Sequence, residues 1–267
     1  MSTAKLRKKA TSLFSVALAA ADPALSVRKI LNTKPLPVLQ DGKIILIAVG
    51  KAATLMAEEA LCHIPQNMPC KAIVITNYEN ARKIDGCEIV ASGHPVPDEN
   101  GEKAAQKVIK ILKQADKKDF ILTLISGGGS ALIPAPIEGI TLQDKIDTNE
   151  LLLRNGYDIH DINMVRQQLS KLKGGGFQRL AKKSKIRSLI ISDVVGDNLK
   201  VIASGPTTAA IGSKAEVVNL FKSRGHWSQL PDAVRAVLKK PELDPISYKH
   251  AGIENTLICS NRQSLLK

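Results

Sequence analysis

Aromatic side chains are scarce in this chain, which has one tryptophan, three tyrosines and four phenylalanines among 267 residues. Proteins that bind single-stranded nucleic acid by base stacking need aromatic platforms, so the composition argues against that class. No apolar run approaches the roughly 20 residues that a transmembrane helix requires. The four cysteines form no C-x-x-C pair and have no histidine cluster nearby, which argues against zinc and favours reduced, buried thiols. We expect a cytoplasmic protein with no membrane partner.

Acidic residues are missing from the stretch 171–187, which holds seven lysines and arginines. Residues 1–45 carry eight basic residues against two acidic ones, and these two stretches account for the formal charge of +13. Such charge admits a polyanion as partner, but a solvated, lysine-rich surface is the ordinary interpretation of a basic run. We disfavour a nucleic-acid partner, and the second stretch can bias a nearby cleft toward small phosphorylated anions.

The first 33 residues fit either a signal peptide or a pair of helices. A basic start, a short apolar stretch and small residues imitate a signal sequence. The apolar residues of 6–18, however, recur near helical spacing, and Asp22 followed by Pro23 is a typical helix start. Because a cleavage site needs no such start, we predict two surface helices.

From residue 43 onward, apolar strand-like runs alternate with helix-like segments. The strand candidates lie at 43–50, 71–77, 88–92, 119–126 and 185–192. The helix candidates lie at 51–61, 100–115, 141–156, 158–175 and around Val217–Phe221. Continuous apolar runs suit strands buried on both faces, so the alternation predicts an α/β fold with a mostly parallel sheet and helices on both faces. Ligands in such sheets bind beyond the carboxyl ends of the strands.

Three of the predicted strands end in residues suited to anions or metal ions. The first runs into Gly50 and Lys51, where a lysine near a helix N-terminus favours an anion. The strand at 119–126 runs into SGGGS (126–130), whose glycine N–H groups can form an anion-binding concavity and whose serines add hydroxyl donors. The last precedes Asp193 and Asp197, carboxylates that can hold Mg²⁺ or accept a proton from a hydroxyl. Ordinary turns and caps are the competing interpretation of each.

Further polar candidates lie between these strands. His94 precedes Pro95 in a long loop, where a lone histidine is more often structural than catalytic. Residues 163–176 combine Arg166 and Lys173 with a second glycine run, and arginine suits bidentate contact with carboxylate or phosphate. The glycine loops match neither G-x-x-x-x-G-K-[ST] nor G-x-G-x-x-G. Phosphoryl transfer, which needs mostly positioning and charge neutralisation, suits these groups best.

Five motifs follow one another in the order VGKAA, SGHPVPDENG, LTLISGGGSAL, INMVRQQLSKLKGGG and ISDVVGDNLKVIASGPT. In this order they resemble the second type of glycerate 2-kinase, the family whose C-terminal half is called the MOFRL domain. The similarity runs from about Asp22 to the C-terminus. It implies transfer of the γ-phosphate of ATP, as co-substrate, to the 2-hydroxyl of D-glycerate with Mg²⁺. It also implies a cleft between a Rossmann-like N-terminal domain and a C-terminal domain.

The resemblance further implies residue roles. Lys51 would stabilise the transferring phosphate, and Asp193 would lie near the metal or the substrate hydroxyl, with Asp197 as the second candidate metal ligand. Arg166 would approach the anionic substrate. The other residues expected to bind substrate or nucleotide are Gly50, His94, Ser126, Gly127, Gly128, Gly129, Ser130, Lys173, Gly174 and Gly175.

The chain departs from this family at VRQQLS, where VRKHLS is common, so Gln167 and Gln168 replace a basic residue and a histidine. We expect residues 1–245 to form the Rossmann-like domain and 246–267 to begin a C-terminal domain that is truncated here. Activity should then be impaired, because charge-stabilising groups of the other cleft wall are missing. The alternatives are a hydroxypyruvate reductase, a name the family often carries, and a non-catalytic anion-binding remnant. The sequence does not determine the oligomeric state, and a homodimer is compatible with it.

Overall fold

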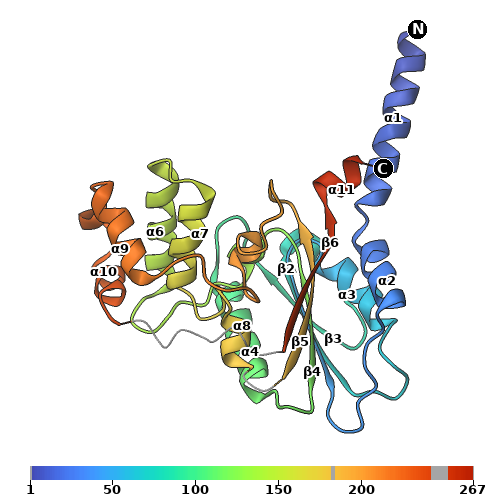
Figure 1. Cartoon of the computed structure of the whole chain (residues 1–267), viewed down its shortest axis with the longest axis horizontal. Coiled ribbons are helices and arrows are strands. Elements are labelled where there is room, and N and C mark those ends of the chain that lie inside the picture. The colour runs from blue at the N-terminus through green and yellow to red at the C-terminus, as the bar shows by residue number, and fades with distance from the viewer. Residues whose placement is uncertain (1, 182–183, 242–251, 267) are drawn as a thin grey trace.

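The structure is a computed structural model that describes residues 2–181, 184–241 and 252–266. Its centre is a six-stranded parallel sheet in the order β3-β2-β1-β4-β5-β6 (Figure 1). The strands are β1 (Ile44–Val49), β2 (Cys70–Asn77), β3 (Cys87–Ser92), β4 (Phe120–Ile125), β5 (Lys185–Ser192) and β6 (Ile253–Ser260). The predicted α/β fold is confirmed, and each predicted strand is present.

Helices cover both faces of the sheet, and a further group stands beside it (Figure 1). One face packs against α2 (Pro23–Thr33) and α3 (Ala53–Leu61), and the other against α4 (Glu99–Gln114) and α8 (Gly176–Leu180). The group beside the sheet has its own apolar cluster and contains α6 (Leu142–Arg154), α7 (Ile159–Gln168), α9 (Lys214–Ser223) and α10 (Asp232–Leu238). The remaining α-helices are α1 (Thr3–Ala20), α5 (Gly129–Leu132) and α11 (Asn261–Leu265).

The central strand β1 shows why its sequence is apolar at every position. Residues 45, 47 and 49 belong to the cluster on the α4 side, and residues 44, 46 and 48 belong to the cluster on the α3 side. Successive side chains of a strand point to opposite faces, so a strand covered on both faces must be apolar throughout. All six residues are buried, which confirms the expectation for this run.

The helix predicted over 158–175 is too long. α7 ends at Gln168, and the chain then passes through a buried turn before α8 begins at Gly176. Gly174 and Gly175 adopt positive φ angles of 52° and 79°, which a right-handed helix cannot contain. The glycine run therefore cannot belong to a helix that continues from α7, which has already ended at Gln168, and α10 has no counterpart among the predicted helices.

The basic stretch 171–187 is only partly the solvated surface that the ordinary interpretation suggests. Lys171 and Lys185 are exposed, but Lys173 and Arg187 are buried. Arg179 donates to the carbonyl oxygens of Lys173 and Gly174 at 2.8 and 2.6 Å, and Arg187 donates to the carbonyl oxygens of Lys34 and Pro35. Carbonyl oxygens thus solvate several of these cations inside the protein. The expectation of buried thiols also needs correction, because Cys62 and Cys70 are exposed.

The two predicted N-terminal helices are present as α1 and α2. The side chain of Asp22 caps α2 by accepting a hydrogen bond from the backbone N–H of Leu25 at 2.8 Å. α1 has no buried side chain and projects from the body of the molecule (Figure 1). Within the described part of the chain, no single helix is long and apolar enough to cross a membrane, although the bent pair α1–α2 together meets that test of length and composition.

The C-terminal strand adds to the same sheet. β6 runs parallel to β5 from Ile253 opposite Ile186 to Ser260 opposite Ser192, with one irregularity between Ile190 and Ile191. The domain boundary predicted at 245/246 lies outside the described residues. What the structure shows is that residues 253–260 form an edge strand of this sheet.

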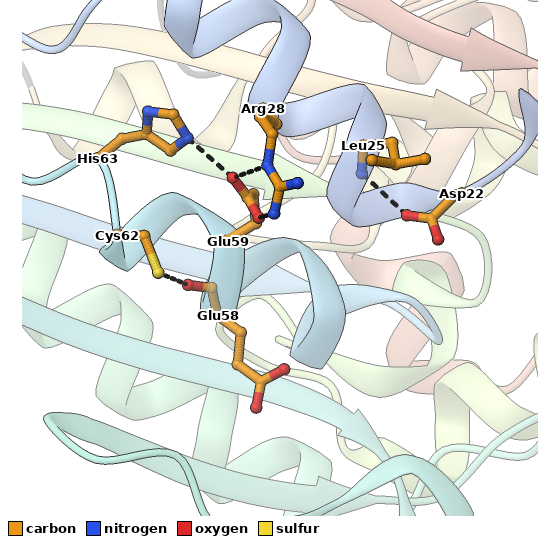
Figure 2. Close-up of polar contacts among 7 residues, drawn as sticks. All are labelled: Asp22, Leu25, Arg28, Glu58, Glu59, Cys62 and His63. Carbon is orange, nitrogen blue, oxygen red and sulfur yellow. Dashed lines mark hydrogen bonds and ion pairs between the residues drawn. The ribbon is translucent and has the colours of Figure 1, made fainter.

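A buried carboxylate fastens α2 to α3, and Figure 2 shows Arg28 and His63 pointing toward it. Arg28 donates from Nε and Nη2 to the two oxygens of Glu59 at 2.8 and 2.5 Å, and His63 Nε2 lies 2.9 Å from the same carboxylate. The Arg28 guanidinium holds the pKa of Glu59 below its usual value. Glu59 is only 7 % exposed, so it depends on these partners for solvation.

We predict that Glu59→Gln lowers the melting temperature by about 3–6 °C at pH 7, because the Arg28 pair is lost. A carboxylate with a depressed pKa contributes stability above its unfolded value of about 4.3, and that contribution disappears as the pH falls through the folded value. The difference in melting temperature between wild type and Glu59→Gln should therefore shrink as the pH falls from about 5 to about 3. Thermal melts followed by circular dichroism measure both effects.

Glu58→Gln is the matched control, because Glu58 pairs with Arg82 at a more exposed position. Exposed pairs add little stability, so this variant should melt close to wild type at every pH. Two results would contradict the anchoring role of Glu59. One is an equal fall in melting temperature in both variants, and the other is a melting-temperature difference between Glu59→Gln and wild type that does not change with pH.

Candidate active site

The candidate site lies where the strand order reverses, between β1 and β4. Ligands of open α/β sheets bind in the crevice at this switch point, beyond the carboxyl ends of the strands. Lys51 follows β1, and the loop from Ser126 to Ser130 follows β4. The backbone N–H of Lys51 donates to Gly127 O at 2.9 Å, and Ser126 N–H donates to Val49 O at 3.0 Å. The two predicted anion-binding loops are therefore side by side.

The glycine loop allows other polar groups to approach it closely. A Cβ atom on Gly127 would lie 1.9 Å from Oδ2 of Asp193, which no real side chain tolerates. Gly128 has a φ of +88°, and a Cβ there would lie 3.0 Å from Cδ2 of His94 and 3.2 Å from Cγ of Lys51. Five predicted site residues thus meet at one point, and only glycine leaves room for them.

A cleft of about 270 Å³ opens at this point. The predicted residues that line it are His94, Gly127, Gly128, Ser130, Arg166, Lys173 and Asp193. A larger cavity, of about 450 Å³, lies at the amino ends of β4 and β5, between Lys185 and Phe120. It contains none of the predicted residues, and amino ends are not where open parallel sheets place their ligands.

Several predicted residues shape the site from behind. Ser126 is buried and its Oγ accepts a hydrogen bond from Ala52 N–H at 3.1 Å, so it ties the two loops together. A Cβ on Gly50 would lie 2.2 Å from that Oγ, and a Cβ on Gly129 would lie 2.8 Å from Cβ of Ala203. These residues permit close packing and do not line the cleft.

The structure does not bring Gly174 and Gly175 to the cleft. Their N–H groups donate to Ser204 O at 3.1 Å and to Gly205 O at 2.9 Å, so they have no donor left for a phosphate. Asp197 also lies outside the cleft lining, in the turn after β5, where its φ is +53°. Gln167 holds the loop that follows, because its side chain bonds Lys200 O, Ser204 O and Ile211 N–H.

Sequence reasoning missed three polar residues of the helical side of the cleft, Lys145, Asn149 and Asn163. The spacing of Lys145 and Asn149 places both on one face of α6, and Asn163 and Arg166 are likewise neighbours on α7. Arg166 donates from Nε and Nη2 to Oδ1 of Asn149 at 2.9 and 2.5 Å. The i,i+3 and i,i+4 spacing of these polar residues indicates that each pair shares one helix face. Which face of each helix points to the cleft, however, depends on tertiary packing.

A strained turn supports the cleft floor. Ala203 and Ser204 both adopt positive φ, at 50° and 58°, a conformation that costs non-glycine residues about 1–3 kcal/mol each. In return, Ser204 Oγ lies 2.7 Å from Ser130 Oγ and donates to Oδ1 of Asn163 at 2.7 Å. Asn163 is almost fully buried, so this network fixes polar groups of the glycine loop and of α7 relative to each other.

The site contains polar groups without internal partners. In the part of the chain that the structure describes, the N–H groups of Gly127 and Gly128 and the carboxylate of Asp193 make no hydrogen bond or ion pair. Partial desolvation of the ring and the charge of Lys51 lower the pKa of His94, and Asp193 opposes them. The histidine is therefore neutral at pH 7, beside open donors and one open carboxylate.

The sheet order and the cleft at its switch point define a Rossmann-like α/β protein. A family model described as "Domain of unknown function (DUF4147)" matches residues 9–239. The chain belongs to this family.

The relatives are named for two activities, glycerate kinase and hydroxypyruvate reductase. The chain is 37% identical over 226 residues to a glycerate 2-kinase of Pyrococcus horikoshii, covering 82% of this chain and 50% of that protein. It is 37% identical over 240 residues, or 90% and 53% of the two chains, to an Agrobacterium vitis protein named for hydroxypyruvate reductase. A crystal structure of a Thermotoga maritima glycerate kinase has a TM-score of 0.84 and 32% identity, covering 97% of this chain and 60% of its own. The chain spans about half the length of the curated relatives it matches.

The placement of Lys51 and Asp193 beside His94 predicts opposite changes in the pKa of that histidine. Lys51→Met should raise the His94 pKa, because a neighbouring positive charge is removed, and Asp193→Asn should lower it, because a negative charge is removed. Titration of the imidazole protons by NMR measures both. Lys171→Met removes a charge from an exposed site and should leave the pKa of His94 unchanged. A change of the same sign in both site variants contradicts this geometry.

Proposed function

We propose that this chain carries a phosphoryl-transfer site of a glycerate 2-kinase, with ATP as co-substrate and D-glycerate as acceptor. The observation that carries the proposal is the meeting of Lys51, the open N–H groups of Gly127 and Gly128, and Asp193 at the switch point. Phosphoryl transfer asks of a protein mainly that it position the reactants and neutralise their charge. The names of the Pyrococcus and Thermotoga relatives support the choice of acceptor.

In this proposal the glycine loop and Lys51 bind the transferring phosphate. Two backbone N–H groups without internal partners suit phosphate oxygens, and the Lys51 ammonium offsets the charge that spreads over those oxygens during transfer. The acceptor hydroxyl oxygen forms the new bond to phosphorus while the bond to the β,γ-bridging oxygen breaks. Asp193 is the carboxylate placed to receive the hydroxyl proton or to hold the metal.

Mg²⁺ fits the residues present if the nucleotide supplies part of its coordination. Within the described ranges no group of three or more histidine, cysteine or acidic side chains could hold a metal by itself. Magnesium, however, is usually held by one or two carboxylates together with substrate phosphates and waters, and Asp193 offers two unpartnered oxygens. Bound there, the ion would neutralise phosphate charge. We propose Asp193 as its protein ligand, because Asp197, four residues further along, lies outside the cleft lining.

A reductase is the second candidate, because the Agrobacterium vitis relative is named for hydroxypyruvate reductase. A nicotinamide cofactor usually rests on a G-x-G-x-x-G turn at the first strand. In this chain the first strand runs into VGKAAT instead. The glycine loop at the fourth strand, SGGGS, does not follow that pattern either. Kinase chemistry therefore accounts better for the residues at the strand ends.

The test is ADP release by the purified chain with ATP, Mg²⁺ and D-glycerate, with the product identified by phosphorus NMR. We expect turnover that needs all three components, and a loss of about 100-fold or more in kcat for Lys51→Met. Asp193→Asn should also lower kcat strongly, with a smaller effect on KM for ATP. Lys171→Met, the exposed control, should stay within about twofold of wild type. NADH oxidation with hydroxypyruvate, in the absence of phosphorylation, would refute the kinase proposal in favour of the reductase.

A further inference from the structure

Three cations gather on the helical side of the cleft, and we call Lys145, Arg166 and Lys173 the cation cluster. All three line the cleft. Lys145 Nζ donates to Leu169 O at 3.0 Å, and Lys173 Nζ donates to Ser130 O at 2.5 Å. Arg166 donates to the neutral side chain of Asn149. Every partner found for the cluster within the described residues is uncharged.

The charges of the cluster oppose one another in a poorly solvated place. Lys173 is 2 % exposed, and Lys145 and Arg166 are partly buried. Burial, reinforced by the charge of Arg166, lowers the pKa of Lys145 to about 7. Burial also lowers the pKa of Lys173 well below its usual value, with Lys145 and Arg166 contributing. Buried charges are normally paired, so a cluster held only by neutral groups lacks a counter-ion.

The lining of the cleft supplies little negative charge of its own. Asp193 is the single carboxylate among the described lining residues, and it lies at the glycine loop on the sheet side. The cluster stands instead on α6, α7 and the turn that follows α7. The two sides of one cleft are thus chemically different. The sheet side offers backbone donors and a carboxylate, whereas the helical side offers cations.

The division of the cleft into two chemically different sides favours a carboxylate at the cluster. The volume of about 270 Å³ is just below the range of about 300–1,000 Å³ typical of small-molecule sites, so it suits a small acceptor. Arg166 can hold either a carboxylate or a phosphate with two parallel hydrogen bonds, but the open N–H groups of the glycine loop already offer a place for the phosphate on the sheet side. We infer that Lys145, Arg166 and Lys173 bind the carboxylate of the acceptor substrate, a small 2-hydroxycarboxylate, and not the phosphates of the nucleotide.

This inference rests on the proposed kinase function and makes it more specific. A carboxylate held by the cluster leaves the hydroxyl on the adjacent carbon, two bonds from the carboxyl carbon, free to face Lys51 and Asp193. The cluster would then determine which acceptors bind and which hydroxyl reaches the phosphate. Lys145, Arg166 and Lys173 act as binding residues here, so their loss should raise KM for the acceptor more than it lowers kcat.

Isothermal titration calorimetry of the whole 267-residue chain tests the inference without turnover. D-glycerate, ADP and inorganic phosphate are titrated separately into wild type, Lys145→Met, Arg166→Gln and Lys145→Arg. We expect Lys145→Met and Arg166→Gln to weaken glycerate binding by about tenfold or more while ADP affinity stays within about threefold. Lys145→Arg keeps the charge and should retain most of the affinity. Lys171→Met, at an exposed site, is the control, and circular dichroism verifies that each variant is folded.

A proton-linked signal gives a second readout. Lys145 faces Arg166 and Lys173, with His94 and Asp193 on the opposite side of the cleft. A bound carboxylate stabilises the protonated amine, so glycerate binding at pH 8 should take up a proton in wild type. Titrations in buffers of different ionisation enthalpy measure that uptake, which Lys145→Arg should reduce while binding persists, with Lys173 supplying any uptake that remains.

The outcomes separate the inference from the function on which it rests. If ADP forms from ATP and glycerate but Lys145→Met changes neither Kd nor KM for glycerate, the inference fails and the kinase proposal stands. If Lys145→Met weakens ADP or phosphate and spares glycerate, the cluster is a phosphate site and the inference fails. Absence of any carboxylate binding to wild type at about 10 mM also overturns it. Lysine-dependent binding of lactate or malonate without kinase activity upholds the carboxylate site and refutes the kinase.

Discussion

The parallel pairing of β1 with β4, from Ile44 opposite Phe120 to Val49 opposite Ile125, determines where every candidate residue lies. These neighbours are distant in sequence, and between them the strand order reverses. The loops that leave the two strands must therefore diverge to opposite faces and leave a crevice between them. Lys51 and the glycine loop line up at that crevice because both strands end at the same level. Without this pairing the glycine loop after β4 would not lie beside Lys51 after β1.

The close approach of polar groups at the crevice lowers local stability. Gly127 and Gly128 have no side chains to pack, and Ala203 and Ser204 adopt a left-handed backbone that larger residues avoid. The surrounding structure compensates through apolar strands buried on both faces and through pairs such as Glu59 with Arg28. Strained residues cluster where polar groups must converge, as they do in other functional sites. The sheet and the strained turn at Ala203 and Ser204 together hold the polar groups of the cleft in place.

The sequence predicts the sheet side of the site well and the helical side only in part, because it indicates Arg166 and Lys173 but not Lys145, Asn149 or Asn163. Strand ends are readable because a buried parallel strand is a continuous apolar run, so Lys51, Gly127 and Asp193 follow from position alone. Lys145 and Asn149 lie on an ordinary polar helix, and only the packing of α6 beside α7 turns them toward the cleft. Gly174 and Gly175 look like an anion loop, yet the turn at Ser204 and Gly205 consumes their N–H groups. Because these hydrogen bonds depend on tertiary structure, the residue types alone do not reveal that the N–H groups are already paired.

The cleft joins two apolar cores that the chain builds separately. The sheet side rests on the clusters around β1 and β4, whereas α6 and α7 belong to a distinct cluster with α9 and α10. Substitutions on α6 and α7 can therefore alter the cation cluster without disturbing the glycine loop, since sites with no shared contacts behave almost additively. Lys173 and Asn163 are exceptions, because Lys173 donates to Ser130 O and Asn163 on α7 is joined to Ser130 through Ser204, so both couple the two sides. If the chain acts as the proposed kinase, substitutions on the helical side would change the acceptor specificity while the sheet side would retain the phosphate chemistry.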